Sequence, residues 1–248
     1  MEFAGPALPL TDADLADAAA LLGVEVAAIS AIDEVESRSR GFLPDGRPQI
    51  LFERHIFGRR TGHRYSAMHP EISGSTPGGY GPAGAHQYAR LHEAMALDRE
   101  AALQSASWGR YQVMGFNAEL CGWPNVEAFV ASMVVREARH LRAFIGYCQA
   151  NDLVRFLVVH DWRSFAAGYN GRGNVDEYSQ KLGEAYRRHS AIAGTDPAGR
   201  IGGVSAVSPR DTIKRIQEAL GVVSDGIFGP RSRAALDAVL RAAGQQGI

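Results

Sequence analysis

The sequence VEVAAISAIDEVESRSRGF, residues 24–42, is the stretch from which the fold is best worked out. At about 100° per residue its apolar side chains fall on one side of a helix, which we predict to end before Gly41. Glu36 points into the middle of that apolar side, whereas Glu34 projects toward solvent and Asp33 lies at the edge. We therefore predict that Glu36 alone is desolvated among these three acids.

Glu36 is a candidate for acid catalysis because of where it stands in this helix. Burial and the negative end of a helix dipole both favour the protonated form of a carboxyl group. A carboxylic acid that keeps its proton near neutral pH can protonate a glycosidic oxygen, so Glu36 is a candidate general acid for glycan cleavage. The alternative is a structural acid, buried as the ion partner of an arginine such as Arg38 or Arg54.

Length, charge and cysteine content limit the class of protein. The 248 residues suffice for one sizeable core and an appendage. A net charge of −1 offers no broad basic surface, so no nucleic-acid partner is expected. Cys121 and Cys148 have neither metal-type nor redox spacing, which indicates free thiols rather than a disulfide framework.

The start of the chain has neither the basic nor the apolar region of an export signal. No apolar run along the sequence is long enough to span a bilayer. We therefore expect a protein that is made in a cytoplasm and has no stable membrane insertion.

Apolar periodicity and turn residues predict a mostly helical chain with one short strand. The segment 58–88, rich in Gly, Pro, Ser, His and Tyr, has no hydrophobic period and is predicted to be a long loop, either a lid or disordered. The predicted helices cover residues 11–22, 24–40, 87–105, 126–150, 152–170 and 175–189, and the strand covers residues 50–52.

Glu53 stands directly after the apolar run of residues 50–52. An acid at the end of a buried run must be either paired or functional, because an isolated buried charge is costly. Glu53 is therefore either a second active-site carboxylate or an ion partner in the neighbourhood of Arg54.

Two segments, residues 105–117 and 165–173, mix aromatic and amide side chains. A ring face for stacking beside an amide that hydrogen-bonds is the combination that carbohydrate sites use. In the second segment Gly171 is predicted to break a helix and to leave a phenol and an amide at its end. The candidate sugar-binding residues are Trp108, Tyr111, Gln112, Tyr169 and Asn170.

These separated pieces together resemble one family. An acid followed by Ser at a helix end, a Gly-x-x-Gln-x-Met segment and Ala-x-Tyr-Asn-Gly are similar to the motifs of goose-type lysozymes and lytic transglycosylases. More closely, residues 10–190 resemble the phage-type N-acetylmuramidase family, although Ser39 stands where that family tends to carry a glycine. The matching segments are residues 35–42, LFERH at 51–55, SASWGRYQVMGFN at 105–117 and FAAGYNG at 165–171.

The resemblance implies a mainly α, lysozyme-like α+β fold and a glycoside hydrolase. Its reaction would be hydrolysis of the β-1,4 bond between N-acetylmuramic acid and N-acetylglucosamine in peptidoglycan. By the same resemblance Glu36 is the general acid, Glu53 holds or activates the water, and Gln112, Tyr169 and Asn170 line the sugar site. Two alternatives stay open: a lytic transglycosylase that forms 1,6-anhydromuramic ends, and a non-catalytic peptidoglycan-binding protein.

The sequence contains no motif typical of a metal-dependent or a cysteine-dependent peptidase. The eight histidines include no HExxH, and neither cysteine sits in a recognisable nucleophile motif. We therefore expect no cofactor and no metal, and neither a zinc peptidase nor a cysteine peptidase.

The C-terminal part is predicted to be a separate module. Residues 191–209 are small, polar and interrupted by Gly and Pro, which is typical of a linker between a catalytic domain at 1–190 and a module at 210–248. In that module DGIFGP, residues 225–230, lies between two apolar helical stripes and resembles the small helical peptidoglycan-binding module of wall hydrolases. The alternatives are a packing extension of the catalytic domain and a cationic tail that disrupts membranes.

Peptidoglycan is the expected partner, and a monomer is the expected state. With this two-part plan and no export signal, the resemblance implies a bacteriophage endolysin, although a bacterial prophage or a secretion effector would have the same plan. Such an endolysin is held in the host cytoplasm until a holin opens the inner membrane and gives it access to the periplasm or cell wall.

Overall fold

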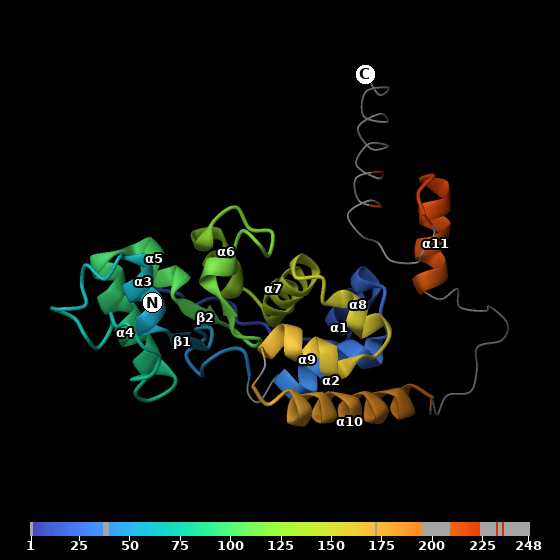
Figure 1. Ribbon diagram of the computed structural model, residues 1–248, viewed down its shortest axis with the longest axis horizontal. Coiled ribbons are helices and arrows are strands. Elements are labelled where there is room, and N and C mark those ends of the chain that lie inside the picture. The colour runs from blue at the N-terminus through green and yellow to red at the C-terminus, as the bar shows by residue number, and fades with distance from the viewer. Residues whose placement is uncertain are drawn as a thin grey trace, which may run out of the picture. The chain divides into compact units, whose positions relative to one another are not determined.

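The computed structural model describes residues 2–36, 40–171, 173–194 and 209–223, together with Ser232 and Ala235. It divides into two compact units (Figure 1). The first comprises Met1–Asp14 and Asp33–Leu153, and the second comprises Leu15–Ile32 and Val154–Ile248. The predictions for Arg38, for Ser39, for most of the linker and for the turn at 225–230 lie outside the described residues.

A three-stranded antiparallel sheet lies in the first unit, with the strands in the order β1-β2-β3. β1 (Ile50–Phe52) pairs with β2 (Ala106–Trp108), and β2 pairs with β3 (Val113–Met114). The register sets Ile50 opposite Trp108 and Phe52 opposite Ala106. The predicted strand at residues 50–52 is therefore confirmed.

Helices surround this sheet. α4 packs on β1 and on α5, and α5 packs in turn on α6 (Figure 1). The large side chains of the core, including Phe52, Phe57, Phe129 and Phe144, have no exposed surface. The helices of this unit are α3 (Arg54–Arg60), α4 (Ala85–Leu97), α5 (Arg99–Gln104), the 3-10 turn η1 (Gly115–Asn117), α6 (Val126–Met133) and α7 (Glu137–Ala150).

In the first unit, two of the long helices predicted from periodicity are each two helices. Asp98 takes an extended conformation and accepts a hydrogen bond from Ala101 N at 3.0 Å, so it ends α4 and caps α5. Arg136 is extended as well, because Leu8 pairs beside it and accepts a hydrogen bond from Glu137 N at 2.9 Å. Periodicity did not reveal either break, since the apolar stripe continues on both sides.

The N-terminal pair of helices, α1 (Asp12–Leu22) and α2 (Val26–Glu36), agrees with the prediction. Thr11 Oγ1 accepts from Asp14 N at 3.3 Å while Asp14 Oδ2 accepts from Thr11 N at 3.0 Å, which is a reciprocal cap. Among the described helices none is long and apolar enough on its own to cross a bilayer. α1 and α2 reach that length and composition only as a pair bent by 118°.

In the second unit α9 packs against both α8 and α10. α10 continues past residue 190, the predicted end of the catalytic domain, as far as Gly194. The predicted helix at 152–170 is interrupted between α8 and α9, where His160 has a φ of 56°. The helices of this unit, besides parts of α1 and α2, are α8 (Val154–Val158), α9 (Trp162–Asn170), α10 (Val175–Gly194) and α11 (Pro209–Ala219).

The structure is thus mainly helical with one small sheet, and the predicted fold class is confirmed.

Candidate active site

Glu36 is the last residue of α2 and is half-buried. On the same helix Ile29 and Ile32 have no exposed surface, and Glu34 is exposed, so the predicted apolar stripe is confirmed. Burial raises the pKa of the Cys148 thiol well above its usual value, and the charges of Cys121 and Glu36 add to that rise. Glu36 therefore lies close enough to Cys148 on α7 for its charge to affect the pKa of that thiol.

Asp33 corrects one prediction, that Glu36 alone is desolvated. Its side chain is 15% exposed and forms a bidentate ion pair with Arg110, at 2.6 and 2.9 Å. Tyr111 Oη also donates to Asp33 Oδ1 at 2.7 Å. A helical wheel places Asp33 only at the edge of the stripe, because its partners arrive from a segment far along the chain.

Glu137, at the start of α7, is the second acid that Arg110 holds. Arg110 Nη1 lies 3.3 Å from Glu137 Oε2, and the Glu137 side chain is 5% exposed. Its oxygens also accept hydrogen bonds from the main-chain nitrogens of Gly41 and Leu10. Burial by itself lowers the pKa of Arg110, but the hydrogen bond to Asp33 and the charges of Asp33 and Glu137 raise it above its usual value.

The chain is therefore held at one point before Glu36 and at another after it. Asp33 lies three residues before Glu36 and Gly41 lies five residues after it, and both are bound through Arg110 and Glu137. Sequence reasoning missed this network. One signal was available: Glu137 stands on the same helical face as apolar residues of its segment, the argument that singled out Glu36.

His140 packs under the same segment. Its Nδ1 accepts from Arg110 N at 3.1 Å, and its Nε2 lies 2.7 Å from Met133 O, so the proton sits on Nε2. Burial lowers the pKa of His140 to about 4, and the ring is neutral at pH 7. A Cβ on Gly41 or Gly109 would lie 2.6 Å from this ring, so both positions require glycine.

Main-chain hydrogen bonds connect this segment to the sheet. Gln49 N donates to Gly41 O at 2.8 Å, and Gly109 N donates to Gln49 O at 2.7 Å. Gln112 Nε2 then donates to Gly109 O at 2.7 Å. A continuous set of hydrogen bonds therefore leads from Gly41 to Gln112.

Gln112 is exposed in the turn between β2 and β3, with a φ of 49°. Ser107 Oγ donates to Gln112 Oε1 at 2.7 Å, so both ends of the amide are held. A side chain that is exposed and yet fixed is suited to meet a ligand, because little rotamer entropy remains to be lost on binding.

Glu53 occupies the turn from β1 into α3, where its main-chain nitrogen donates to Ser105 O at 2.9 Å. Its side chain is 16% exposed, with Oε2 3.1 Å from His55 Nδ1. Burial raises the pKa of the Tyr80 phenol, and the charge of Glu53 and a hydrogen bond to it contribute. Arg54, the ion partner considered for both glutamates, instead donates to Pro70 O at 3.2 Å.

Trp108 and Tyr111, two of the predicted sugar-binding residues, are both buried. Trp108 is 1% exposed and donates from Nε1 to Leu103 O at 3.1 Å, and Tyr111 is 2% exposed and contacts Phe144. Trp108 packs against Phe3, and Tyr111 packs against Phe144 of α7, so both rings belong to the core, and their stacking on a sugar stays a prediction.

Tyr169 and Asn170 belong to the second unit, at the end of α9. The predicted helix break is confirmed, since α9 ends at Asn170 and Gly171 has a φ of 73°. Asn170 is exposed, and the half-buried Tyr169 stacks on Phe165 with ring centroids 5.8 Å apart. A depression of about 620 Å³ lies nearby in this unit, lined by Arg163, Ser164, Ala167, Asn174, Val175, Asp176 and Glu177.

Comparisons with known proteins find similarity to a family and to solved structures. The model of the N-acetylmuramidase family matches residues 25–190. The crystal structure of a Burkholderia AP3 phage endolysin is similar at 44% identity, over 74% of this chain and 72% of that chain, with a TM-score of 0.70. No curated protein matches the sequence.

Proposed function

This chain belongs to the N-acetylmuramidase family, and we propose that it hydrolyses the β-1,4 bond between N-acetylmuramic acid and N-acetylglucosamine with Glu36 as the general acid. Membership in this family makes the protein a glycoside hydrolase whose substrate is peptidoglycan. Its similarity to a phage endolysin supports the role of an endolysin.

One observation carries the assignment of the acid. Glu36 ends α2 in a half-buried position, with Asp33 before it bound by Arg110 and Gly41 after it bound by Glu137. A general acid must meet the leaving oxygen at hydrogen-bond distance in a fixed orientation, which such support provides.

The proposed reaction is a hydrolysis. Glu36 gives its proton to the bridging oxygen as the bond from that oxygen to the anomeric carbon of N-acetylmuramic acid breaks. A water molecule adds to the anomeric carbon, and Glu53 holds that water and accepts its proton. The leaving sugar departs with a free hydroxyl, Glu53 releases the proton of the water to solvent, and Glu36 regains a proton, which returns both carboxyl groups to their starting states.

Three further side chains are proposed to bind the sugar chain. Gln112 offers an amide held by Ser107, and Tyr169 and Asn170 offer a phenol and an amide at the end of α9. Trp108 and Tyr111 are proposed to support the sheet that carries Gln112 rather than to touch the substrate, because both are buried.

The test is a matched pair of variants on one helix. Glu36→Gln is expected to abolish the loss of turbidity of a peptidoglycan suspension while binding to the same material is retained. Glu34→Gln, which changes an exposed acid two residues earlier, is expected to keep full activity. Full lysis by Glu36→Gln would overturn the assignment of the acid.

The products separate hydrolysis from its closest rival. Mass spectrometry of the digest is expected to show reducing N-acetylmuramic acid ends, which require that water attacks the anomeric carbon. Anhydromuramic ends would show instead that the 6-hydroxyl of the sugar attacks, as in a lytic transglycosylase.

The C-terminal part is proposed to bind the cell wall as a separate module. In α11, Gln217 is 1% exposed and donates from Nε2 to Oγ of the buried Ser232 at 3.0 Å. A buried polar contact between segments fifteen residues apart supports a folded module rather than an extended tail. Removal of residues 195–248 is expected to weaken binding to purified peptidoglycan, and unchanged binding would contradict the proposal.

The setting is proposed from the same likeness. We expect a monomer that stays in the host cytoplasm until a holin gives it access to the wall. Sedimentation of the purified chain tests the first point, and fractionation of producing cells with and without a holin tests the second.

A further inference from the structure

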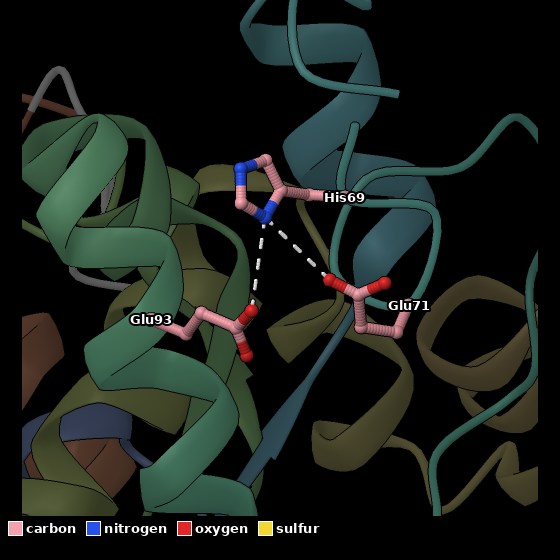
Figure 2. A group of neighbouring side chains, drawn as sticks. All are labelled: His69, Glu71 and Glu93. Carbon is pink, nitrogen blue, oxygen red and sulfur yellow. Dashed lines mark ion pairs between the residues drawn. The ribbon is translucent and has the colours of Figure 1, made fainter. Parts of the chain in front are cut away.

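We propose that His69, Glu71 and Glu93 form a binding site for a divalent metal ion, for which Zn²⁺ fits best. Figure 2 shows the three side chains turned toward one another, two from the segment between α3 and α4 and one from α4. His69 Nδ1 lies 3.6 Å from Glu71 Oε1 and 3.7 Å from Glu93 Oε1, and all three ligand atoms lie within 4.8 Å of one another.

These separations suit a shared cation better than direct contacts. Hydrogen bonds from nitrogen to oxygen are about 2.7–3.2 Å long, so His69 is too far from either carboxylate for a good one. Four ligands placed tetrahedrally at about 2.0–2.2 Å from Zn²⁺ stand about 3.3–3.6 Å from one another. The two distances from His69 Nδ1 are close to that spacing, and a small movement of the side chains completes it.

The main chain behind the ligands is already fixed. Arg54 Nη1 donates to Pro70 O at 3.2 Å, and Arg90 Nη2 donates to Glu71 O at 2.8 Å. The next residues of the segment, Ile72 and Ser73, are 0% and 1% exposed. A site whose backbone is held before the metal arrives loses less entropy on binding.

The donor set selects the kind of ion. One imidazole nitrogen and two carboxylate oxygens suit zinc and its transition-metal neighbours, whereas Mg²⁺ and Ca²⁺ prefer oxygen ligands alone. The side chains of His69, Glu71 and Glu93 are 34%, 55% and 48% exposed, so water is available for the remaining coordination position.

The site would fasten a loop rather than act on the glycan. Arg90 on α4 donates to the carbonyls of both Glu71 and Tyr80, and Tyr80 contacts the proposed second carboxylate, Glu53. A metal ion held by Glu93 and the segment at 69–71 would add a further connection between that loop and α4 to those that Arg90 makes. We therefore expect metal binding to raise stability.

The test uses the full chain without an affinity tag, stripped with a chelator and titrated with Zn²⁺ by calorimetry at pH 7. One equivalent is expected to bind, with a melting temperature about 5 °C higher when free Zn²⁺ is at a hundred times Kd. Co²⁺ in place of Zn²⁺ is expected to give the visible absorption of a nitrogen and oxygen site.

Variants assign the binding to these residues. Glu93→Gln and His69→Gln are each expected to weaken Zn²⁺ binding by at least about tenfold. His92→Gln is the matched control, because His92 is also exposed and lies 3.5 Å from one carboxylate, Glu2, but among the residues that the structure describes it belongs to no such group of three. Absence of binding to the full chain, or binding that Glu93→Gln leaves unchanged, would overturn the proposal.

Discussion

Arg110 holds Asp33 through two parallel hydrogen bonds, from Nε to Oδ1 at 2.6 Å and from Nη2 to Oδ2 at 2.9 Å. Asp33 lies nearly one helical turn before Glu36, and Arg110 lies two residues after the end of β2. The pair therefore sets the rotation of the last turn of α2 against the sheet. A bidentate pair specifies orientation as well as distance, which a single contact does not.

Removal of Arg110 leaves two half-buried or buried acids without their partner. We expect Arg110→Met to lower the free energy of unfolding by about 3–5 kcal/mol, because Asp33 and Glu137 remain as uncompensated charges. Urea unfolding measures the change, and turbidity assays are expected to show reduced activity at temperatures where the variant is folded. Arg59→Met, at an exposed position of α3, serves as the control and is expected to change stability by less than about 0.5 kcal/mol.

His140 makes stability depend on pH. Its pKa is lowered to about 4 by burial, whereas in the unfolded chain it is about 6.5, so the unfolded state binds the proton more readily between these values. This contribution is fully present above pH 6.5 and is lost as the pH falls toward 4, by about 3 kcal/mol in all. Urea unfolding at several pH values between 4 and 6.5 gives the free energy of unfolding as a function of pH. We expect this free energy to change less steeply with pH in His140→Gln than in the unchanged protein, and an equal change in both would contradict the assignment.

Gly109→Ala combines two costs that a second variant separates. Gly109 has a φ of 72°, and an added Cβ would lie 2.6 Å from the His140 ring. We expect a loss of about 3 kcal/mol from backbone strain and overpacking together. Gly122 has a φ of 94°, and an added Cβ would have no atom within 4 Å. Gly122→Ala is therefore expected to lower the free energy of unfolding only by the backbone strain, about 1 kcal/mol, as measured from its melting curve.

Glu53→Gln tests the second carboxylate. If Glu53 accepts the proton of the attacking water, kcat falls by about 100-fold or more while the affinity for peptidoglycan is kept. Glu100→Gln, at an exposed position of α5, provides a control for loss of charge alone. Full activity of the Glu53 variant would limit that residue to pairing with His55 and Tyr80.

Trp108→Phe distinguishes a core residue from a sugar platform. Because the ring is buried and its Nε1 donates to Leu103 O, the change is expected to cost about 2 kcal/mol of stability. The affinity of the folded variant for peptidoglycan is expected to match that of the unchanged protein. A large loss of affinity without loss of stability would show that Trp108 contacts the substrate.

Local pattern was sufficient for several parts of this protein. The stripe through Ile29 and Ile32, the strand at residues 50–52 and the helix break at Gly171 each depend on neighbours within a few residues. Their conformations follow from side-chain spacing and from the freedom of glycine, which are properties of the sequence.

The breaks at Asp98 and Arg136 were not predicted, because the competing interactions are a local cap and a contact with Leu8 that periodicity does not register. The same limit applies to the aromatic residues of the segment at 105–117. Composition indicated a sugar site, but burial between sheet and helix made Trp108 and Tyr111 part of the core.

The sequence by itself determined the family, the mainly helical class and the candidate acid Glu36 in an apolar stripe. Only the tertiary structure decided which ionisable side chains meet. It places Asp33 and Glu137 against Arg110, and it places His69 beside two glutamates. The physical reason is range. Helix and turn preferences act over a few residues, whereas an ion pair depends on a distance in space that the folded chain alone sets, here across 77 residues between Asp33 and Arg110.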